Sequence, residues 1–262
     1  MEVAGKVIVV TGAASGIGRG LCQRFAKEGA KAIIAADINE AGAKETATEV
    51  KGDALLCDVS KEEDVMRLAK FAHDKYGRID LFCSNAGILG AAGGYEVAND
   101  VWQSIWEINV LAHVLVARAV IPEMIKQGGG AIMITASAAG LLSQIGSLPY
   151  SVTKHAAVGL AENLSITYGD QGIQIFLLCP QAVESEMTRG HEGGGVAGVD
   201  GLMKVEELAD AVMESFAADE FLILPHKEVK TYMQRKAADY DRWLKGMRGL
   251  QQRFFSGGPL KK

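Results

Sequence analysis

The sequence predicts an α/β protein built on a doubly wound parallel sheet. Short apolar runs of strand length alternate with longer helical patterns from residue 6 to about residue 180. The first run leads directly into a glycine-rich turn, and polar residues follow most of the other runs. Strands that alternate with helices indicate a parallel sheet covered on both faces, and such sheets bind ligands at the carboxyl ends of their strands.

Length and composition are those of a globular protein with an acidic balance. The 262 residues, 48% hydrophobic and 23% charged, suffice to bury a substantial core. The net charge of −5 argues against nucleic acid as the main partner. We find no apolar run that approaches the length of a membrane span, so we expect no integral membrane segment. The four cysteines are scattered and no metal-type ligand cluster is present, so we expect reduced thiols, no metal and a cytoplasmic location.

The first strand, residues 6–10, ends in a turn that suits a pyrophosphate. Glycines let a backbone approach the phosphates closely, and the N-terminus of the following helix offers unpaired N–H groups. The turn residues that we expect to contact a dinucleotide are Gly12, Ser15, Gly16, Ile17 and Gly18.

The second strand, residues 32–36, is followed by Asp37 and Ile38. A carboxylate about twenty residues after the glycines can accept hydrogen bonds from the adenosine ribose hydroxyls. The same carboxylate repels a 2′-phosphate, and no arginine stands beside it or in the glycine turn. The sequence therefore favours NAD over NADP.

The alternation then continues through the chain. A strand at 54–57 leads to Asp58 and Val59, with a helix from residue 62 to about 75. A strand at 79–83 ends at Ser84-Asn85-Ala86-Gly87. A long helix over about 100–127 holds Asn109, and we expect Pro122 to kink or interrupt it.

The last strands bring two further polar positions to the same edge. The strand at 131–135 is followed by Ser137, and the strand at 173–179 ends at Pro180. Pro149 opens a helix whose first turn holds Tyr150, a favourable position for proline. Because Gly12, Asp37, Asp58, Asn85, Ser137 and Pro180 all follow strands, we expect them to converge.

Tyr150 and Lys154 are four residues apart, which places them on one face of a helix. A nearby ammonium favours the phenolate, so the phenol would exchange a proton near neutral pH. Tyr232 and Lys236 repeat the spacing, but they lie beyond the alternating pattern and no serine stands thirteen residues before them. Tyr150 lies within the alternating pattern and has a serine, Ser137, thirteen residues before it. We therefore select Tyr150, and not Tyr232, as the candidate.

Together these residues resemble the short-chain dehydrogenase/reductase family in its compact, single-domain Rossmann-like form. The resemblance spans roughly residues 5–225 and rests on Thr11 to Gly18, Asp58-Val59, Asn85-Ala86-Gly87, Asn109, Ser137 and Tyr150 with Lys154. It implies that Tyr150 is the general acid/base, that Ser137 polarises the substrate oxygen, and that Lys154 lowers the phenol pKa and binds the nicotinamide ribose. Asn109 would support a proton-relaying water chain. The cofactor bed implied by the resemblance also includes Asp58, Val59, Asn85, Ala86, Gly87, Pro180, Val183 and Ser185.

The chain departs from the family pattern at a few positions. Ser84 stands where the family often has a second asparagine, and Gln181 stands where a glycine usually follows the proline. Asn109 and Asn85 also have plain structural interpretations, as a packing residue and as a turn residue. Gln181 would either narrow the pocket or contact the substrate.

Two stretches, 89–95 and 139–149, are expected to set substrate choice. Apolar residues dominate them and neither holds a lysine or arginine, which favours a hydrophobic secondary alcohol or its ketone. Core packing is the alternative explanation for Leu141, Leu142, Ile145 and Leu148. We expect residues 186–203 to form a mobile lid within a catalytic domain of residues 1–225.

Residues 226–262 predict a C-terminal helical extension with apolar residues at spacings of three and four. Ten basic and three acidic side chains fall within 227–262. This extension would dock on the body or on a second subunit, or contact an anionic membrane or partner. The resemblance implies a homodimer or homotetramer.

The sequence thus predicts an NAD-dependent oxidoreductase that acts on a nonpolar secondary alcohol, in the oxidative direction. An NAD-dependent epimerase or dehydratase of the same fold is one alternative, although such proteins are usually longer. A non-catalytic NAD-sensing protein is the other, but it would have no need of an activated phenol.

Overall fold

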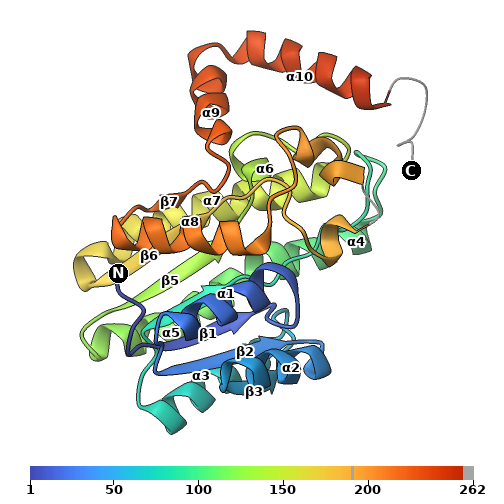
Figure 1. Cartoon of the computed structure of the whole chain (residues 1–262). Helices are drawn as coiled ribbons and strands as arrows, with labels where there is room; N and C mark the ends of the chain where they lie inside the picture. The colour runs from blue at the N-terminus through green and yellow to red at the C-terminus, as the bar shows by residue number, and fades with distance from the viewer. Residues whose placement is uncertain (190–191, 256–262) are drawn as a thin grey trace.

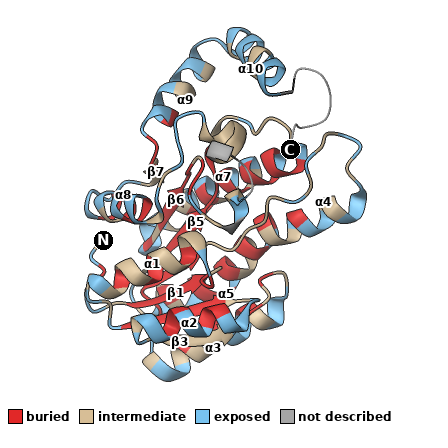
Figure 2. Cartoon of the chain, turned by 45° about the vertical axis from the view of Figure 1, so that its right-hand side comes forward, coloured by how far each residue is buried: buried red, intermediate tan, exposed pale blue. Residues whose placement is uncertain are grey.

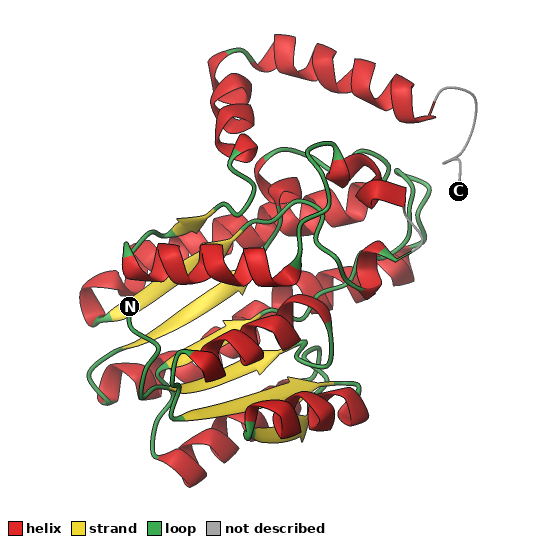
Figure 3. Cartoon of the chain, viewed as in Figure 1, coloured by secondary structure: helices red, strands yellow, loops and turns green. Residues whose placement is uncertain are grey.

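The computed structural model describes residues 1–189 and 192–255. Seven parallel strands form one sheet in the order β3-β2-β1-β4-β5-β6-β7, which confirms the doubly wound architecture (Figure 3). The strands are β1 Val7–Thr11, β2 Ala32–Asp37, β3 Asp53–Leu56, β4 Leu81–Ser84, β5 Gly130–Thr135, β6 Ile173–Leu178 and β7 Leu222–Ile223. The order reverses between β1 and β4, so the carboxyl ends of these two strands open a crevice.

Helices cover both faces of the sheet (Figure 1). One layer contains α1 Gly16–Lys27, α2 Glu40–Val50 and α8 Val205–Ala217, and the other contains α3 Glu62–Tyr76, α5 Ala112–Lys126 and α7 Leu148–Tyr168. Short 3-10 helices lie at Gly169–Gln171, Glu186–Thr188 and Glu192–Gly198, and α6 spans Ala138–Leu141.

The central strand β1 explains why its sequence is apolar at every position. Val7 and Val9 pack into the core under α3, α5 and α7, whereas Ile8 and Val10 pack into the core under α1 and α8. Successive side chains of a strand point to opposite faces, so a strand covered on both sides has no polar face.

The long helix after β4 is not interrupted at Pro122, contrary to the sequence-based expectation. Pro122 lies inside α5, and the departure from α-helical geometry is a π turn at Glu107–Leu111, between α4 Asn99–Trp106 and α5. No periodicity in the sequence indicates this turn. Such turns are frequent at functional sites, and this one holds Asn109.

The same helical run corrects the expectation about membrane-length segments. Asn99–Lys126 spans 28 residues and holds an 18-residue window of mean hydropathy 1.6, long and apolar enough to cross a bilayer. Within the described residues, 56% of that window is buried. More than half of this window therefore packs in the core of the fold, chiefly against the sheet and α3, although Trp106 and Leu111 are exposed.

The C-terminal extension forms two helices instead of one continuous helix. α9 spans Glu228–Ala238 and α10 spans Tyr240–Phe255, with Asp239 in an extended conformation between them. The Asp239 carboxylate accepts a hydrogen bond of 2.9 Å from the backbone N–H of Arg242, so Asp239 ends one helix and caps the next. Residues 256–262 of the predicted extension lie outside the described residues.

α10 stands away from the body of the molecule (Figures 1 and 2). None of its described side chains is buried, although its apolar residues recur on one face: Tyr240, Trp243, Leu244, Met247, Leu250 and Phe254. α9 is anchored, because the Lys236 ammonium donates hydrogen bonds of 2.8 and 3.1 Å to the carbonyls of Leu141 and Leu142. The body therefore leaves the apolar face of α10 open.

Candidate active site

A cavity of about 610 Å³ lies at the carboxyl ends of the strands. It brings together every residue that the sequence predicted for the site except Asn109. These lining residues are Gly12, Ser15, Gly16, Ile17, Gly18, Asp37, Ile38, Asp58, Val59, Asn85, Ala86, Gly87, Ser137, Tyr150, Lys154, Pro180, Val183 and Ser185. The convergence follows from the topology, since parallel strands end at one edge.

The turn after β1 accepts glycine alone at two positions. Gly12 has φ +68°, and a Cβ there would lie 2.9 Å from the Cα of Ala86. A Cβ on Gly18 would lie 2.1 Å from the carbonyl oxygen of Gly12. Ser15 precedes α1, and its side chain makes no capping hydrogen bond. The first backbone N–H groups of α1 therefore receive no hydrogen bond from Ser15.

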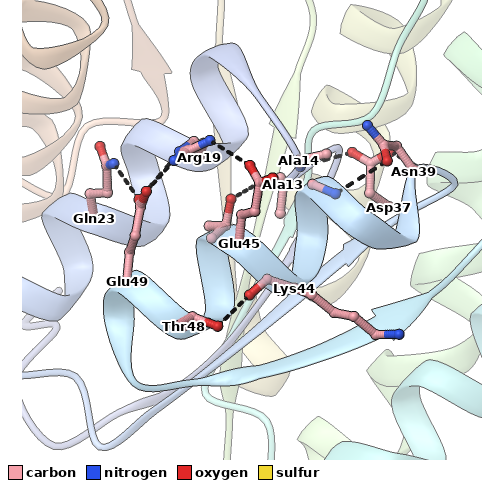
Figure 4. Close-up of polar contacts among 12 residues, drawn as sticks. Ala13, Ala14, Arg19, Gln23, Asp37, Asn39, Lys44, Glu45, Thr48 and Glu49 are labelled. Carbon is pink, nitrogen blue, oxygen red and sulfur yellow. Dashed lines mark hydrogen bonds and ion pairs between the residues drawn. The ribbon is translucent and has the colours of Figure 1, made fainter.

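Asp37 lies at the end of β2 with both carboxylate oxygens engaged by the backbone (Figure 4). One oxygen accepts a hydrogen bond of 2.9 Å from the N–H of Ala14, and the other accepts one of 2.8 Å from the N–H of Asn39. A carboxylate has about four acceptor positions, so roughly two remain for hydroxyl donors. The carboxylate is thereby fixed toward the glycine turn.

Arg19, the basic residue next to the glycine turn, is directed away from Asp37. Its guanidinium hydrogen-bonds Glu49 and lies 3.6 Å from a carboxylate oxygen of Glu45, both on α2 (Figure 4). These ion pairs hold a cation that could otherwise attract a 2′-phosphate.

Asn85 joins three strands beneath the cavity. Its side-chain N–H donates to the carbonyl of Thr11, and its side-chain oxygen accepts from the Thr135 hydroxyl, each at 3.0 Å. The Thr11 hydroxyl accepts from the N–H groups of Asn85 and Ala86 and donates to the carbonyl of Cys83. Asn85 thus has the structural role in the turn that the sequence left open, at the edge of the site.

Asn109 does not line the cavity but lies directly behind its wall. It is fully buried, and its amide both donates to and accepts from the backbone of Ile88, at 2.8 and 2.9 Å. It also donates to the hydroxyl of Thr153 at 3.3 Å. A Cβ on Gly87 would approach the Asn109 oxygen to 3.2 Å and the Lys154 nitrogen to 3.4 Å, so both groups meet behind Gly87.

Ser137 and Tyr150 line the cavity together. The Ser137 hydroxyl accepts from the N–H of Ala139 at 3.1 Å, which caps α6, and donates to the carbonyl of Pro180 at 3.3 Å. Burial raises the pKa of Tyr150, and a hydrogen bond with Ser137 offsets part of that rise. Both residues line the same cavity.

Burial of Tyr150 opposes the lowering of the phenol pKa that the resemblance implies for Lys154. The ammonium is 3% exposed and donates to the carbonyl of Thr135 at 3.0 Å. It lies 5.6 Å from the centre of the Tyr150 ring, and burial lowers its own pKa to about 8. Desolvation of the phenol outweighs the remaining favourable interactions.

Ser137 and Tyr150 are kept in register by a contact between α6 and α7. Gly140 packs directly on the backbone of Lys154, because a Cβ on Gly140 would lie 2.4 Å from the Lys154 carbonyl oxygen. No other residue type fits at Gly140 without separating the two helices.

The apolar wall near Tyr150 differs from the predicted one. Ile88, Leu89, Ile108 and Met187 line the cavity, whereas Leu141, Leu142, Ile145 and Leu148 do not. Leu141 instead packs against the core, which is the alternative that the sequence allowed. The stretch that begins at Leu89 therefore contributes as expected, and Met187 belongs to the segment 186–203 that the sequence analysis expected to act as a lid. Ile88 and Ile108 were not predicted, because no motif marks them.

The second tyrosine-lysine pair does not belong to this cavity. Tyr232 donates a hydrogen bond of 2.8 Å to Asp200, which raises the pKa of the phenol. Lys236 instead anchors α9 to Leu141 and Leu142. Both residues have structural roles in the extension.

Comparison with known proteins agrees with this geometry. Residues 6–193 match the family model of the short chain dehydrogenases. The 1-deoxy-11-beta-hydroxypentalenate dehydrogenase of Streptomyces exfoliatus is 34% identical over 247 residues, which cover 91% of this chain and 90% of the relative. The chain therefore belongs to the short-chain dehydrogenase/reductase family of oxidoreductases.

Solved structures support the same assignment. A short chain dehydrogenase/reductase from Burkholderia phymatum in complex with NAD superposes with a TM-score of 0.84 at 26% identity, over 92% of this chain and 96% of that one. The 3-ketoacyl-(acyl-carrier-protein) reductase from Brucella melitensis complexed with NADH gives a TM-score of 0.78 at 29% identity, over 85% of this chain and 96% of that one.

Proposed function

We propose that this protein is an NAD-dependent oxidoreductase that interconverts a largely nonpolar secondary alcohol and its ketone. The observation that carries the proposal is that Ser137, Tyr150 and Lys154 line one cavity, with the Lys154 ammonium 5.6 Å from the centre of the Tyr150 ring. The named dehydrogenase and the NAD-bound relatives support it.

The residues around the outer part of the cavity fit a dinucleotide. Gly12 and Gly18 leave no room for a Cβ, so the turn suits a group that approaches the backbone closely. Asp37 retains acceptor positions for ribose hydroxyls, while its negative charge disfavours a 2′-phosphate. Asp58 and Val59 would contact the adenine, and Val183 and Ser185 would contact the carboxamide end.

When bound, NAD supplies the hydride acceptor and brings a positive charge into the site. Ser137 holds the substrate oxygen, and Tyr150 takes the hydroxyl proton during oxidation or returns it during reduction. Lys154 stabilises the phenolate while it holds the nicotinamide ribose. Asn109 keeps the Ile88 backbone in place and supports the path by which the proton leaves.

The substrate side of the cavity supports an apolar skeleton. Ile88, Leu89, Ile108 and Met187 form the wall, and no lysine or arginine lines it apart from Lys154 among the described residues. We propose that residues 186–203 close over the bound substrate. The N–H of Ala182 donates to the carbonyl of Ala197, and the N–H of Met203 donates to the carbonyl of Ala182, so the later part of that segment is tied to Ala182. Residues 190–191 lie outside the described residues.

The reaction is tested by the appearance of NADH at 340 nm over a panel of cyclic and aromatic secondary alcohols, with NAD and NADP in parallel. Oxidation of a nonpolar alcohol with NAD, and more slowly with NADP, is the expected result. Equal use of NADP would contradict the proposed cofactor, and no turnover of any alcohol or ketone would contradict the proposed reaction.

We also propose that the protein is a homo-oligomer in which α10 docks on a second copy of the chain. The chain has 27 basic and 32 acidic side chains; ten and three of these lie in residues 227–262, which leaves 17 and 29 in the body. In the proposed oligomer, the basic, amphipathic helix α10 of one copy binds the acidic body of another, because their charges are opposite. An anionic membrane would repel that same body, which favours the second copy as the partner of α10.

A further inference from the structure

Gln181 is the one glutamine that lines the cavity in the described chain, and it shares that cavity with Ser137 and Tyr150. It follows Pro180, whose carbonyl accepts hydrogen bonds from the Ser137 hydroxyl at 3.3 Å and from the N–H of Ala138 at 2.9 Å. The short connection from Ser137 through Pro180 places the backbone of Gln181 next to the proposed position of the substrate oxygen.

The side-chain amide of Gln181 has no protein partner among residues 1–189 and 192–255. Its oxygen is buried, and no described donor reaches it. A buried acceptor without a donor is unfavourable, whereas exposed amides satisfy themselves with water. Because Gln181 lines the cavity while its buried amide oxygen lacks a donor, a rotation of the side chain would bring that oxygen to a hydroxyl bound there.

His226 holds the Gln181 backbone in place from behind. The N–H of Gln181 donates a hydrogen bond of 3.2 Å to Nδ1 of His226, whose side chain is almost fully buried. Because Nδ1 accepts, the ring proton of the neutral histidine lies on Nε2, and burial lowers the pKa of the ring toward that neutral form. His226 thus fixes the main chain from which the amide projects.

We infer that Gln181 is a specificity-determining residue that binds a second oxygen function of the substrate, a hydroxyl that donates to the amide oxygen. The substrate class is then a diol or a hydroxyketone on an otherwise apolar skeleton. This inference rests on the proposed function and narrows its substrate. A site built to hydrogen-bond a hydroxyl rejects analogues without it more strongly than an apolar wall rejects an added methylene.

The test compares cyclohexanol with the 1,2-, 1,3- and 1,4-cyclohexanediols as substrates with NAD. In the wild-type protein at least one diol is expected to exceed cyclohexanol in kcat/KM by about 10- to 100-fold. Gln181→Leu, which keeps the volume and removes the amide, is expected to bring that ratio close to one. Gln144→Leu is the matched control, because its amide is part-buried outside the cavity and donates to the carbonyl of Ile145. An unchanged ratio in Gln181→Leu, or no diol preference in the wild type, overturns the inference.

His226 is tested as a positioning residue through the same ratio. His226→Leu removes the acceptor for the Gln181 N–H and is expected to lower the diol preference. His226→Asn places an amide oxygen near the position of Nδ1 and is expected to restore much of it. Equal ratios in both variants would show that His226 does not position the amide.

A binding measurement separates this inference from the proposed reaction. Calorimetric titration of NAD-saturated Tyr150→Phe with the same four alcohols measures affinity without turnover. Tighter binding of a diol that Gln181→Leu abolishes supports the role of Gln181, even where no NADH forms and the proposed reaction fails. Equal affinities for the diols and cyclohexanol overturn the inference.

Discussion

Ser84 Oγ and His113 Nδ1 lie 2.7 Å apart, and both side chains are buried behind the cavity. Ser84 stands where the family resemblance expects a second asparagine, and its hydroxyl pairs with His113 on α5. Burial and the nearby charge of Lys154 lower the pKa of His113 from 6.5 to about 3. The histidine is therefore neutral in the folded protein.

This pair predicts a loss of stability in mild acid. The unfolded chain binds a proton at His113 below about pH 6.5 and the folded chain does not, so stability falls as the pH drops from about 6.5 toward 3. Between pH 7.5 and pH 5 this one residue accounts for about 2 kcal/mol of the free energy of unfolding. His113→Gln, which keeps a hydrogen-bonding group, is expected to flatten that dependence in urea titrations. His155→Gln, at an exposed histidine, is the control and is expected to retain it.

Replacement of Tyr150 by phenylalanine is expected to lower kcat by about 10²- to 10⁴-fold, because the proton acceptor is lost while the ring still packs. NAD affinity, measured by fluorescence titration, should change little. Tyr232→Phe is the matched control, since its hydroxyl bonds Asp200 outside the cavity. Near-normal turnover in Tyr150→Phe would contradict the proposed mechanism.

The raised pKa of Tyr150 predicts opposite pH profiles for the two directions. Oxidation needs the phenolate, so its kcat/KM is expected to rise with pH across the neutral range. Reduction needs the protonated phenol and is expected to be flat or to fall with rising pH. Lys154, with its pKa near 8, loses its charge above that value and then stabilises the phenolate less. A rate of oxidation that falls between pH 6 and pH 8 would exclude Tyr150 as the base.

Asp37 is expected to determine the choice between NAD and NADP. Asp37→Ser should lower kcat/KM for NAD by about 10- to 100-fold, because hydrogen bonds to a charged group are lost, and it should raise NADP use. Asp37→Asn keeps acceptors but not the charge, so it should raise NADP use with a smaller loss for NAD. Steady-state kinetics with both cofactors measure the two effects. Unchanged cofactor preference in both variants would remove Asp37 from the cofactor site.

The docking of α10 on a second copy predicts a site-specific cross-link between chains. The four native cysteines are buried, so Leu250→Cys introduces an accessible thiol for a benzophenone maleimide. Irradiation is expected to give a covalent dimer on a denaturing gel. Gln252→Cys, on the opposite face of α10, is the control and should cross-link less. Cross-linking only within one chain, or only to added anionic vesicles, would contradict the proposed partner.

Much of the fold and most of the cavity lining could be predicted, because strand ends, glycines and a helix-spaced tyrosine and lysine leave local marks in the sequence. The π turn at Glu107–Leu111 leaves none, since its extra residue does not alter an already apolar pattern. The membrane-length run was misjudged because polar residues such as Asn109 and His113 break it into short pieces in the sequence, although the helix joins them.

Other features depend on contacts between distant residues. His113 has no motif, and its partnership with Ser84 joins positions 29 residues apart. The division of the extension at Asp239 follows from a cap that the spacing of apolar residues conceals. The pKa of Tyr150 depends on the balance between burial and charge, which spacing alone does not determine.

Gly140 has a consequence for how this scaffold can diversify. It lets α6, which follows Ser137, pack on the backbone of α7, which carries Tyr150, with no side chain in between. Substitutions at Leu89, Met187 or Gln181 can therefore reshape the substrate chamber while the reacting hydroxyls keep their spacing. Under the proposed mechanism, the residues that recognise the substrate can change without moving those that transfer the proton, so a library that varies the chamber and preserves Gly140 should yield new substrate ranges.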